Sequence, residues 1–174
     1  MIVADTGAIL ALIDKSDTHH AALRAIYLDD PDAWLLPWAI LPEVDYLVAT
    51  HLGAPAERVW LADVADGSYV VEWGTTRDLA AARGLAERYA SLEIGLVDAV
   101  VMAVAERLEA DIATVDLRDF GAVTLRHAPR LLPRDAGLTS SAARGRTPAS
   151  ARRSRDAGRR GSAARRPLSR GRSG

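Results

Sequence analysis

Apolar and polar positions along residues 1–133 alternate in short blocks that predict strands and helices in turn. Residues 1–4 form a brief apolar run that stops at Asp5-Thr6-Gly7, and the apolar segment 8–13 predicts a short buried helix. Further strands are predicted at 33–37, 69–73, 112–115 and 122–125, with helices at 42–52, 55–66 and 76–89, and a helix capped by Ser16 or Asp17 after the first. This alternation predicts a three-layer α/β/α fold with a central parallel sheet.

The longest apolar stretch of the chain begins directly after Asp98. Residues 99–105 are all apolar, and polar side chains return only at Glu106, so the pattern predicts a helix that is buried over most of its surface, with Asp98 at its start. Residues 112–115 then predict a buried strand that leads to Asp116, with Asp119 in the following loop. In an open α/β sheet, helix starts and strand ends share one edge, so Asp98 and Asp116 should meet there.

Two further acidic residues fall at the same kind of position. Asp5 ends the first strand and begins a helix, and Glu43 follows Pro42 in the first turn of another. Each alone has an ordinary structural explanation, as a helix cap or as a charge that complements the helix dipole. Together with Asp98 and Asp116, however, they predict four carboxylates at one edge of the sheet.

Such a group of carboxylates favours a bound cation, because like charges held close together raise one another's pKa and a cation removes the conflict. The chain has no cysteine, and its four histidines have no spacing that would suit a shared metal. Hard oxygen ligands alone select Mg²⁺ or Mn²⁺. A carboxylate-held Mg²⁺ with open positions is suited to phosphodiester hydrolysis, where it generates hydroxide and neutralises charge on the phosphate.

These residues carry a resemblance to a known family. The chain resembles PIN-domain ribonucleases, specifically VapC-type toxins of bacterial toxin–antitoxin pairs, over residues 1–133. The matching motifs are Val3-Ala4-Asp5-Thr6, Pro42-Glu43 followed by Asp45-Tyr46-Leu47-Val48, Val97-Asp98-Ala99, and Thr114-Val115-Asp116 with Asp119-Phe120. The set is specific because the motifs occur together in this order and spacing.

The resemblance implies a function and assigns residues to it. It implies that Asp5, Glu43, Asp98 and Asp116 form a catalytic, metal-binding pocket, with Asp119 as a further candidate and Thr6 and Thr114 as hydroxyls that line it. It also implies Mg²⁺- or Mn²⁺-dependent cleavage of RNA, homodimerisation, and inhibition by a cognate antitoxin whose C-terminal segment enters the groove. The stretch 43–50 is similar to toxins that cut a ribosomal RNA loop, although tRNA-cutting toxins share the fold.

The distribution of charge divides the chain into two parts. The formal net charge is −1, but residues 1–133 hold 10 Lys and Arg against 21 Asp and Glu, whereas residues 134–174 hold 12 Arg against 2 Asp. The second part has only Leu138 and Leu168 as sizeable apolar side chains, so we expect a disordered Arg-rich tail after a nuclease domain at 1–133. Such a tail departs from the family pattern, and we expect it to add non-specific affinity for RNA.

The sequence also predicts a cytoplasmic protein that has no contact with a membrane. No apolar run approaches the length of a membrane span, and the first residues lack the basic start of a signal peptide.

Other functions are compatible with parts of the pattern. A phosphoaspartate enzyme of the haloacid dehalogenase type also places Asp after its first strand, but it needs a second Asp where this chain has Gly7 and a late Lys, and the one Lys here is Lys15. The missing Lys counts equally against a receiver domain. The main alternative is a non-catalytic RNA-binding module with a degenerate pocket and a basic tail, which a titration with divalent metal would separate from an enzyme.

Overall fold

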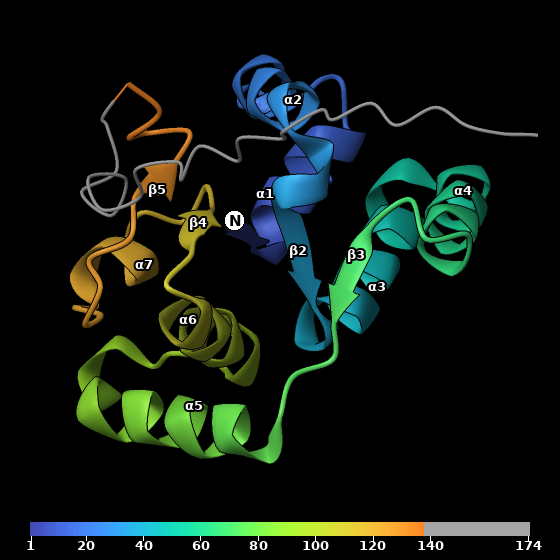
Figure 1. The fold of residues 1–174 in the computed structure, drawn as a ribbon. Helices are drawn as coiled ribbons and strands as arrows, with labels where there is room; N and C mark the ends of the chain where they lie inside the picture. Colours follow the sequence, from blue (N-terminus) through green and yellow to red (C-terminus); the bar gives the residue numbers. More distant parts are fainter. Residues whose placement is uncertain (138–174) are drawn as a thin grey trace, which may run out of the picture. The chain divides into compact units, whose positions relative to one another are not determined.

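The computed structural model describes residues 1–137 of the chain; most of the predicted Arg-rich tail, residues 138–174, lies outside the described residues. Its centre is a sheet of five strands in the order β3-β2-β1-β4-β5, and every neighbouring pair is parallel. The strands are β1 Ile2–Ala4, β2 Trp34–Pro37, β3 Val70–Glu72, β4 Asp111–Ala113 and β5 Leu131–Leu132. The predicted parallel sheet flanked by helices is therefore confirmed (Figure 1).

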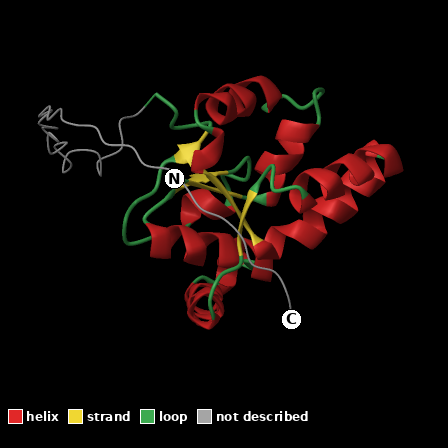
Figure 2. Cartoon of the chain, turned by 45° about the vertical axis from the view of Figure 1, so that its right-hand side comes forward, coloured by secondary structure: helices red, strands yellow, loops and turns green. Residues whose placement is uncertain are grey.

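Helices account for most of the remaining chain. They are α1 Thr6–Ile13, α2 His20–Asp29, α3 Leu41–Leu52, α4 Ala54–Ala65, α5 Thr76–Arg88, α6 Leu96–Leu108 and α7 Asp119–Ala122, with 3₁₀ turns at Pro31–Ala33, Trp38–Ile40 and Ala90–Leu92. In Figure 1, α5 and α6 lie below the strands and α2 lies above them, and Figure 2 shows the short strands enclosed by helices in a second view.

Helix α6 forms the centre of the core. It packs against β1, β2 and β4 on one side and against α5 on the other. Every residue from Ala99 to Ala105 is buried as a result, which confirms the burial predicted from the apolar run. Asp98 lies in the first turn of this helix, as predicted, but the N-cap position is taken by Gly95, which provides no side-chain cap.

The order of the strands creates a point where the chain's winding reverses. From β1 the chain moves outward through β2 to β3, and from β4 it moves in the opposite direction to β5. The carboxyl ends of β1 and β4 therefore lie side by side, joined by a hydrogen bond from the Asp5 amide to the Ala113 carbonyl at 2.9 Å. In open α/β sheets this reversal opens a crevice at the strand ends, where ligands bind.

The structure corrects the prediction of the last strand. Residues 122–125 do not form it: Ala122 ends α7, Val123 to Leu125 are irregular, and the strand beside β4 is Leu131–Leu132. Both segments are short and apolar, but it is the later one that pairs with β4, and the chain before it forms a helical turn. The Asp116 carboxylate accepts hydrogen bonds from the amides of Arg118 and Asp119, at 2.9 and 3.1 Å, and this turn starts α7 where a loop was expected.

Helix α2 starts later than either predicted cap. Its first residue is His20, and its N-cap, His19, makes no side-chain cap bond. Asp17 instead accepts the amide of His19 at 2.6 Å in the turn that precedes the helix, and Asp14 accepts that of Ser16 at 2.8 Å. Both acidic side chains therefore stabilise the connecting turn and do not cap the helix.

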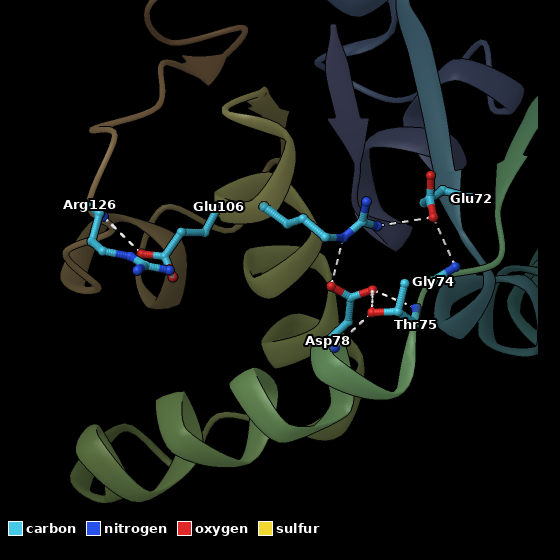
Figure 3. A network of polar contacts seen from close by, with 7 residues as sticks. Glu72, Gly74, Thr75, Asp78, Glu106 and Arg126 are labelled. Atoms are coloured by element: carbon cyan, nitrogen blue, oxygen red, sulfur yellow. Dashed lines mark hydrogen bonds and ion pairs between the residues drawn. The ribbon is translucent and has the colours of Figure 1, made fainter.

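A partly exposed ionic network fixes the start of α5. Thr75 and Asp78 form a reciprocal capping box, and Arg107 of α6 donates to Asp78 at 2.8 Å and to Glu72 of β3 at 3.0 Å (Figure 3). The Glu72 carboxylate also accepts the amide of Gly74 at 2.9 Å. One guanidinium thus ties together the end of β3, the start of α5 and the last turn of α6.

The described chain continues in ordered contact beyond residue 133. Asp135 accepts the amide of Leu131 through its side chain at 2.8 Å, and its own amide donates to the Leu131 carbonyl at the same distance. No helix within residues 1–137 is long and apolar enough to cross a membrane.

Candidate functional site

Four predicted carboxylates lie near the carboxyl ends of β1 and β4, and we refer to Asp5, Glu43, Asp98 and Asp116 as the acidic cluster. Asp5 follows β1, Asp116 follows β4, and Glu43 and Asp98 lie in the first turns of α3 and α6. The structure brings them into electrostatic contact, since Asp98 and Asp116 both raise the pKa of Asp5, and Glu43 and Asp116 both raise that of Asp98. Their predicted convergence on one edge of the sheet is thus found in the fold.

Asp5 is the most deeply placed member of the acidic cluster. It is 5% exposed, caps α1 by accepting the Gly7 amide at 2.6 Å, and accepts a hydrogen bond from the Thr114 hydroxyl. Burial raises its pKa to about 6, the neighbouring carboxylates add to the rise, and the two hydrogen bonds oppose it. Asp5 is therefore a helix cap, as the ordinary structural explanation holds, and its surroundings also disfavour its ionised form.

Gly7 is required by the same geometry. A Cβ at this position would lie 2.7 Å from a methyl carbon of Val115, so another residue here would require the Val115 side chain or the start of α1 to shift. Gly7 therefore allows the close approach that places Asp5 beside Thr114.

Asp98 has the same kind of electrostatic environment with greater access to solvent. Its pKa is raised to about 6, first by burial and then by Glu43, Asp116 and Asp119, while Arg118 opposes the rise. Asp98 is half-buried, and Glu43 and Asp116 are exposed. The acidic cluster is therefore deep at Asp5 and open to solvent on the side of Glu43 and Asp116.

Hydroxyl groups hold the carboxylates in position. Thr6 donates to Glu43 at 2.6 Å, and the Thr114 oxygen accepts the Asp116 amide at 3.0 Å while its hydrogen goes to Asp5. Thr6 and Thr114, which the family resemblance identified, thus bridge the segments that carry the acidic cluster. Thr114 is fully buried, so its two contacts are shielded from water.

Asp119, the further candidate, is differently placed. It is buried and accepts two hydrogen bonds from the adjacent Arg118, at 2.8 and 3.0 Å. Two other arginines of the described chain are also paired, Arg126 with Glu106 at 2.9 Å and Arg130 with Asp111 at 2.6 Å. Contact with RNA would compete with these ion pairs.

The donor chemistry of the acidic cluster fits a hard divalent cation, since it offers carboxylate oxygens whose mutual repulsion a cation would relieve. Among residues 1–137, however, no three Asp, Glu or His side chains already stand in an arrangement that would hold a metal. The hydrogen bonds explain why: Asp5, Glu43 and Asp116 are each turned toward a hydroxyl or amide donor. Binding a cation would require some of these side chains to rotate.

Comparison with known proteins identifies the family. The PIN-domain family model matches residues 2–125. Ribonuclease VapC26 of Mycobacterium tuberculosis is 31% identical over 123 residues, which cover 70% of this chain and 91% of VapC26. The chain belongs to the PIN-domain family and, within it, to the VapC-type proteins.

Solved structures share the fold. The crystal structure of Mycobacterium tuberculosis VapC20, a sarcin–ricin loop cleaving toxin, is similar with a TM-score of 0.63 and 21% identity, over 72% of this chain and 97% of VapC20. The VapBC2 complex of Rickettsia felis, solved with a DNA fragment of its promoter, gives a TM-score of 0.56 and 15% identity, over 75% of this chain and 97% of the matched chain.

Proposed function

We propose that this protein is a metal-dependent endoribonuclease that acts as the toxin of a toxin–antitoxin pair. The observation that carries the proposal is the acidic cluster itself: Asp5 and Asp98 hold pKa values raised to about 6 at the reversal point of the sheet, and no ion pair within residues 1–137 involves either. Ionisable groups that a fold keeps in an unfavourable environment cluster at functional sites.

The residues of the acidic cluster would hold Mg²⁺ or Mn²⁺, and the cation would supply activation of water and neutralisation of charge on the phosphate. Thr114 donates to the Asp5 carboxylate and Thr6 to that of Glu43, so binding of a cation would compete with these two hydrogen bonds. The exposed side of the cluster, at Glu43 and Asp116, is where a phosphodiester would approach.

RNA is the proposed substrate. VapC26 is named a ribonuclease and VapC20 cleaves the sarcin–ricin loop, which supports a ribosomal RNA loop as the target, with tRNA as the other candidate. The described residues carry more acidic than basic side chains, so the substrate's approach depends on neutralisation of the acidic cluster by its cation.

An antitoxin is the proposed protein partner. Similar chains have been solved as VapBC complexes, among them those from Rickettsia felis and Salmonella typhimurium. An arginine of the antitoxin would suit the acidic cluster, because a guanidinium binds two carboxylate oxygens in a fixed fork. Homodimerisation, implied by the family, is part of the same proposal.

A matched pair of helix starts provides the test. Helices α3 and α4 both have Pro in the first two positions and Glu in the first turn, Glu43 and Glu57 respectively. We expect Glu43→Gln to lower RNA cleavage by about 100-fold or more, as removal of one electrostatic group of a catalytic centre does. Glu57→Gln should leave cleavage within about twofold, because Glu57 does not belong to the acidic cluster. It is a matched control, since both substitutions remove a charge that interacts with a helix dipole. RNA ends sequenced after induced expression would give the target and the rate.

Equal activity of the two variants would contradict the assignment of Glu43 to the site. RNA binding without cleavage at any Mg²⁺ or Mn²⁺ concentration would favour the alternative, a non-catalytic RNA-binding module.

A further inference from the structure

A cavity of about 370 Å³ opens beside the acidic cluster, between the start of α2 and the ends of β4 and β5. Its walls are aliphatic and come from three separate segments, Ala22, Val115, Leu117 and Pro133. Thr114 also lines this cavity, and its side chain donates to Asp5 and accepts from the Asp116 amide. One residue therefore borders both the cavity and the acidic cluster.

Two groups with polar nitrogens complete the lining of the cavity. They are His19 and Arg134, whose side chains are 48% and 47% exposed. Asp135 holds the guanidinium through Nε and Nη2, both at 2.7 Å, and so orients the Arg134 side chain. These hydrogen-bond donors, next to aliphatic walls, would fit a planar ring whose faces are apolar and whose edge carries hydrogen-bond acceptors.

We propose that this cavity is a nucleobase subsite, which takes an unpaired base of the nucleotide next to the phosphate that is cleaved. This inference rests on the proposed ribonuclease function. Sequence-specific proteins recognise RNA largely through unstacked bases that are splayed out into pockets and bonded along their edges. A base covalently tied to the reacting phosphate must lie close to the acidic cluster, and the walls at Val115 and Leu117 flank Asp116 in the chain.

The lining favours RNA over an apolar side chain of a protein partner. An aliphatic side chain would contact the apolar walls but would leave the polar groups of His19 and Arg134 unused. A nucleotide would use both, because its base packs against the walls and its base edge or phosphate bonds to His19 and Arg134. Arginine pairs well with the acceptor edge of guanine. The lining contains no Phe, Tyr or Trp, so any stacking on the base would come from the imidazole of His19 or the guanidinium of Arg134.

Neighbouring alanines on α2 allow a matched test. Ala22 lines the cavity and Ala21 does not, and both are exposed. Ala22→Glu places a carboxylate in the cavity, and Ala21→Glu makes the same charge change on the same helix. The probe is a short RNA that spans the mapped cleavage position, synthesised with one abasic nucleotide at each flanking position in turn.

For the wild type, we expect one abasic position beside the cut to lower kcat/KM about tenfold or more, as loss of a bound base does in other single-strand sites. The Ala22→Glu protein should lose this penalty because its subsite is blocked, and the Ala21→Glu protein should keep it. An equal penalty in all three proteins would overturn the proposal. So would loss of antitoxin binding in Ala22→Glu with the abasic penalty intact, since the cavity would then belong to the protein partner.

The proposed function can fail separately. If the wild type cleaves no RNA at any divalent metal concentration, the ribonuclease assignment is wrong. Binding of a fluorescent random-sequence RNA then tests whether the cavity binds a nucleotide. Weaker RNA binding by Ala22→Glu than by Ala21→Glu would support a nucleotide site in the cavity, and equal binding would contradict it.

Discussion

Asp5 and Asp78 are both buried aspartates at the start of a helix, and their surroundings are opposite. Asp5 caps α1 and has carboxylates around it, with its pKa raised to about 6 by burial and like charge. Asp78 belongs to the capping box of α5 and faces Arg107 at 2.8 Å. Burial alone would raise the pKa of Asp78, but hydrogen bonds from Arg107 and Thr75 outweigh that effect and lower it.

The difference separates a carboxylate with a structural role from one that we propose to be functional. Paired and hydrogen-bonded, Asp78 stabilises the native state, and its removal would leave Arg107 without its main partner. Asp5 carries a charge that the metal-free fold opposes, so it is retained at a cost to stability. Helix-start position is common to both residues, and only the neighbouring charges distinguish them.

The largest expected contrast between the two aspartates is in catalysis. Asp5→Asn keeps the shape and the cap while removing the charge, so we expect cleavage of RNA to fall by about 100-fold or more. Asp78→Asn should change activity by less than about threefold per folded molecule, because Asp78 lies in the α5 network and not in the acidic cluster. Single-turnover cleavage by the two folded variants measures this, and an active Asp5→Asn protein would remove Asp5 from the site.

Stability should show the reverse order. Asp78→Asn breaks the ionic bond to Arg107 and weakens the capping box, and we expect a loss of about 2 kcal/mol in the free energy of unfolding. Arg107→Gln should cost a similar amount, and the double variant less than the sum, because the two residues share one interaction. Urea denaturation of the four proteins gives the coupling energy, and full additivity would mean that the network contributes little.

A divalent cation should stabilise the protein through the acidic cluster and not through the α5 network. A ligand that binds the folded state alone raises the free energy of unfolding by about 2.7 kcal/mol at 100 times its dissociation constant. We expect Mg²⁺ or Mn²⁺ to raise Tm, EDTA to reverse the rise, and Asp98→Asn to reduce it, while Asp78→Asn should show the full rise. An unchanged Tm in the wild type at millimolar metal would contradict the proposed metal site.

The two aspartates should also differ in how their contribution to stability depends on pH. The folded pKa of Asp5, about 6, lies above the unfolded value of 3.8, so its contribution to stability is complete below pH 4 and is lost as the pH rises through 6. Without metal, Asp5→Asn should therefore match the wild type near pH 4 and exceed it by about 3 kcal/mol at pH 8. Asp78 has the opposite sign, since its lowered pKa makes it stabilising above the unfolded value and less so in acid.

Equilibrium unfolding in EDTA at a series of pH values checks this prediction. A constant difference between wild type and Asp5→Asn across the range would show that the Asp5 charge is not destabilising.

The sequence by itself determined the alternation of strands and helices, the burial of α6 and the positions of the four acidic residues at element ends. These follow from local patterns: apolar runs, capping residues and the Asp-Thr-Gly turn depend on neighbours a few positions apart. The last strand was predicted at 122–125 instead of Leu131–Leu132, because both segments are short and apolar and only pairing with β4 distinguishes them.

The tertiary structure decided which carboxylates are compensated. Glu72, Asp78 and Arg107 lie far apart in the chain, and nothing in their local sequence indicates that they meet, although the Thr75-x-x-Asp78 spacing does indicate a capping box. The cavity beside Thr114 likewise combines segments near residues 20, 115 and 133. A residue's charge and its place in an element are local properties, but its pKa and its partners depend on charges that only the folded chain brings within a few ångströms.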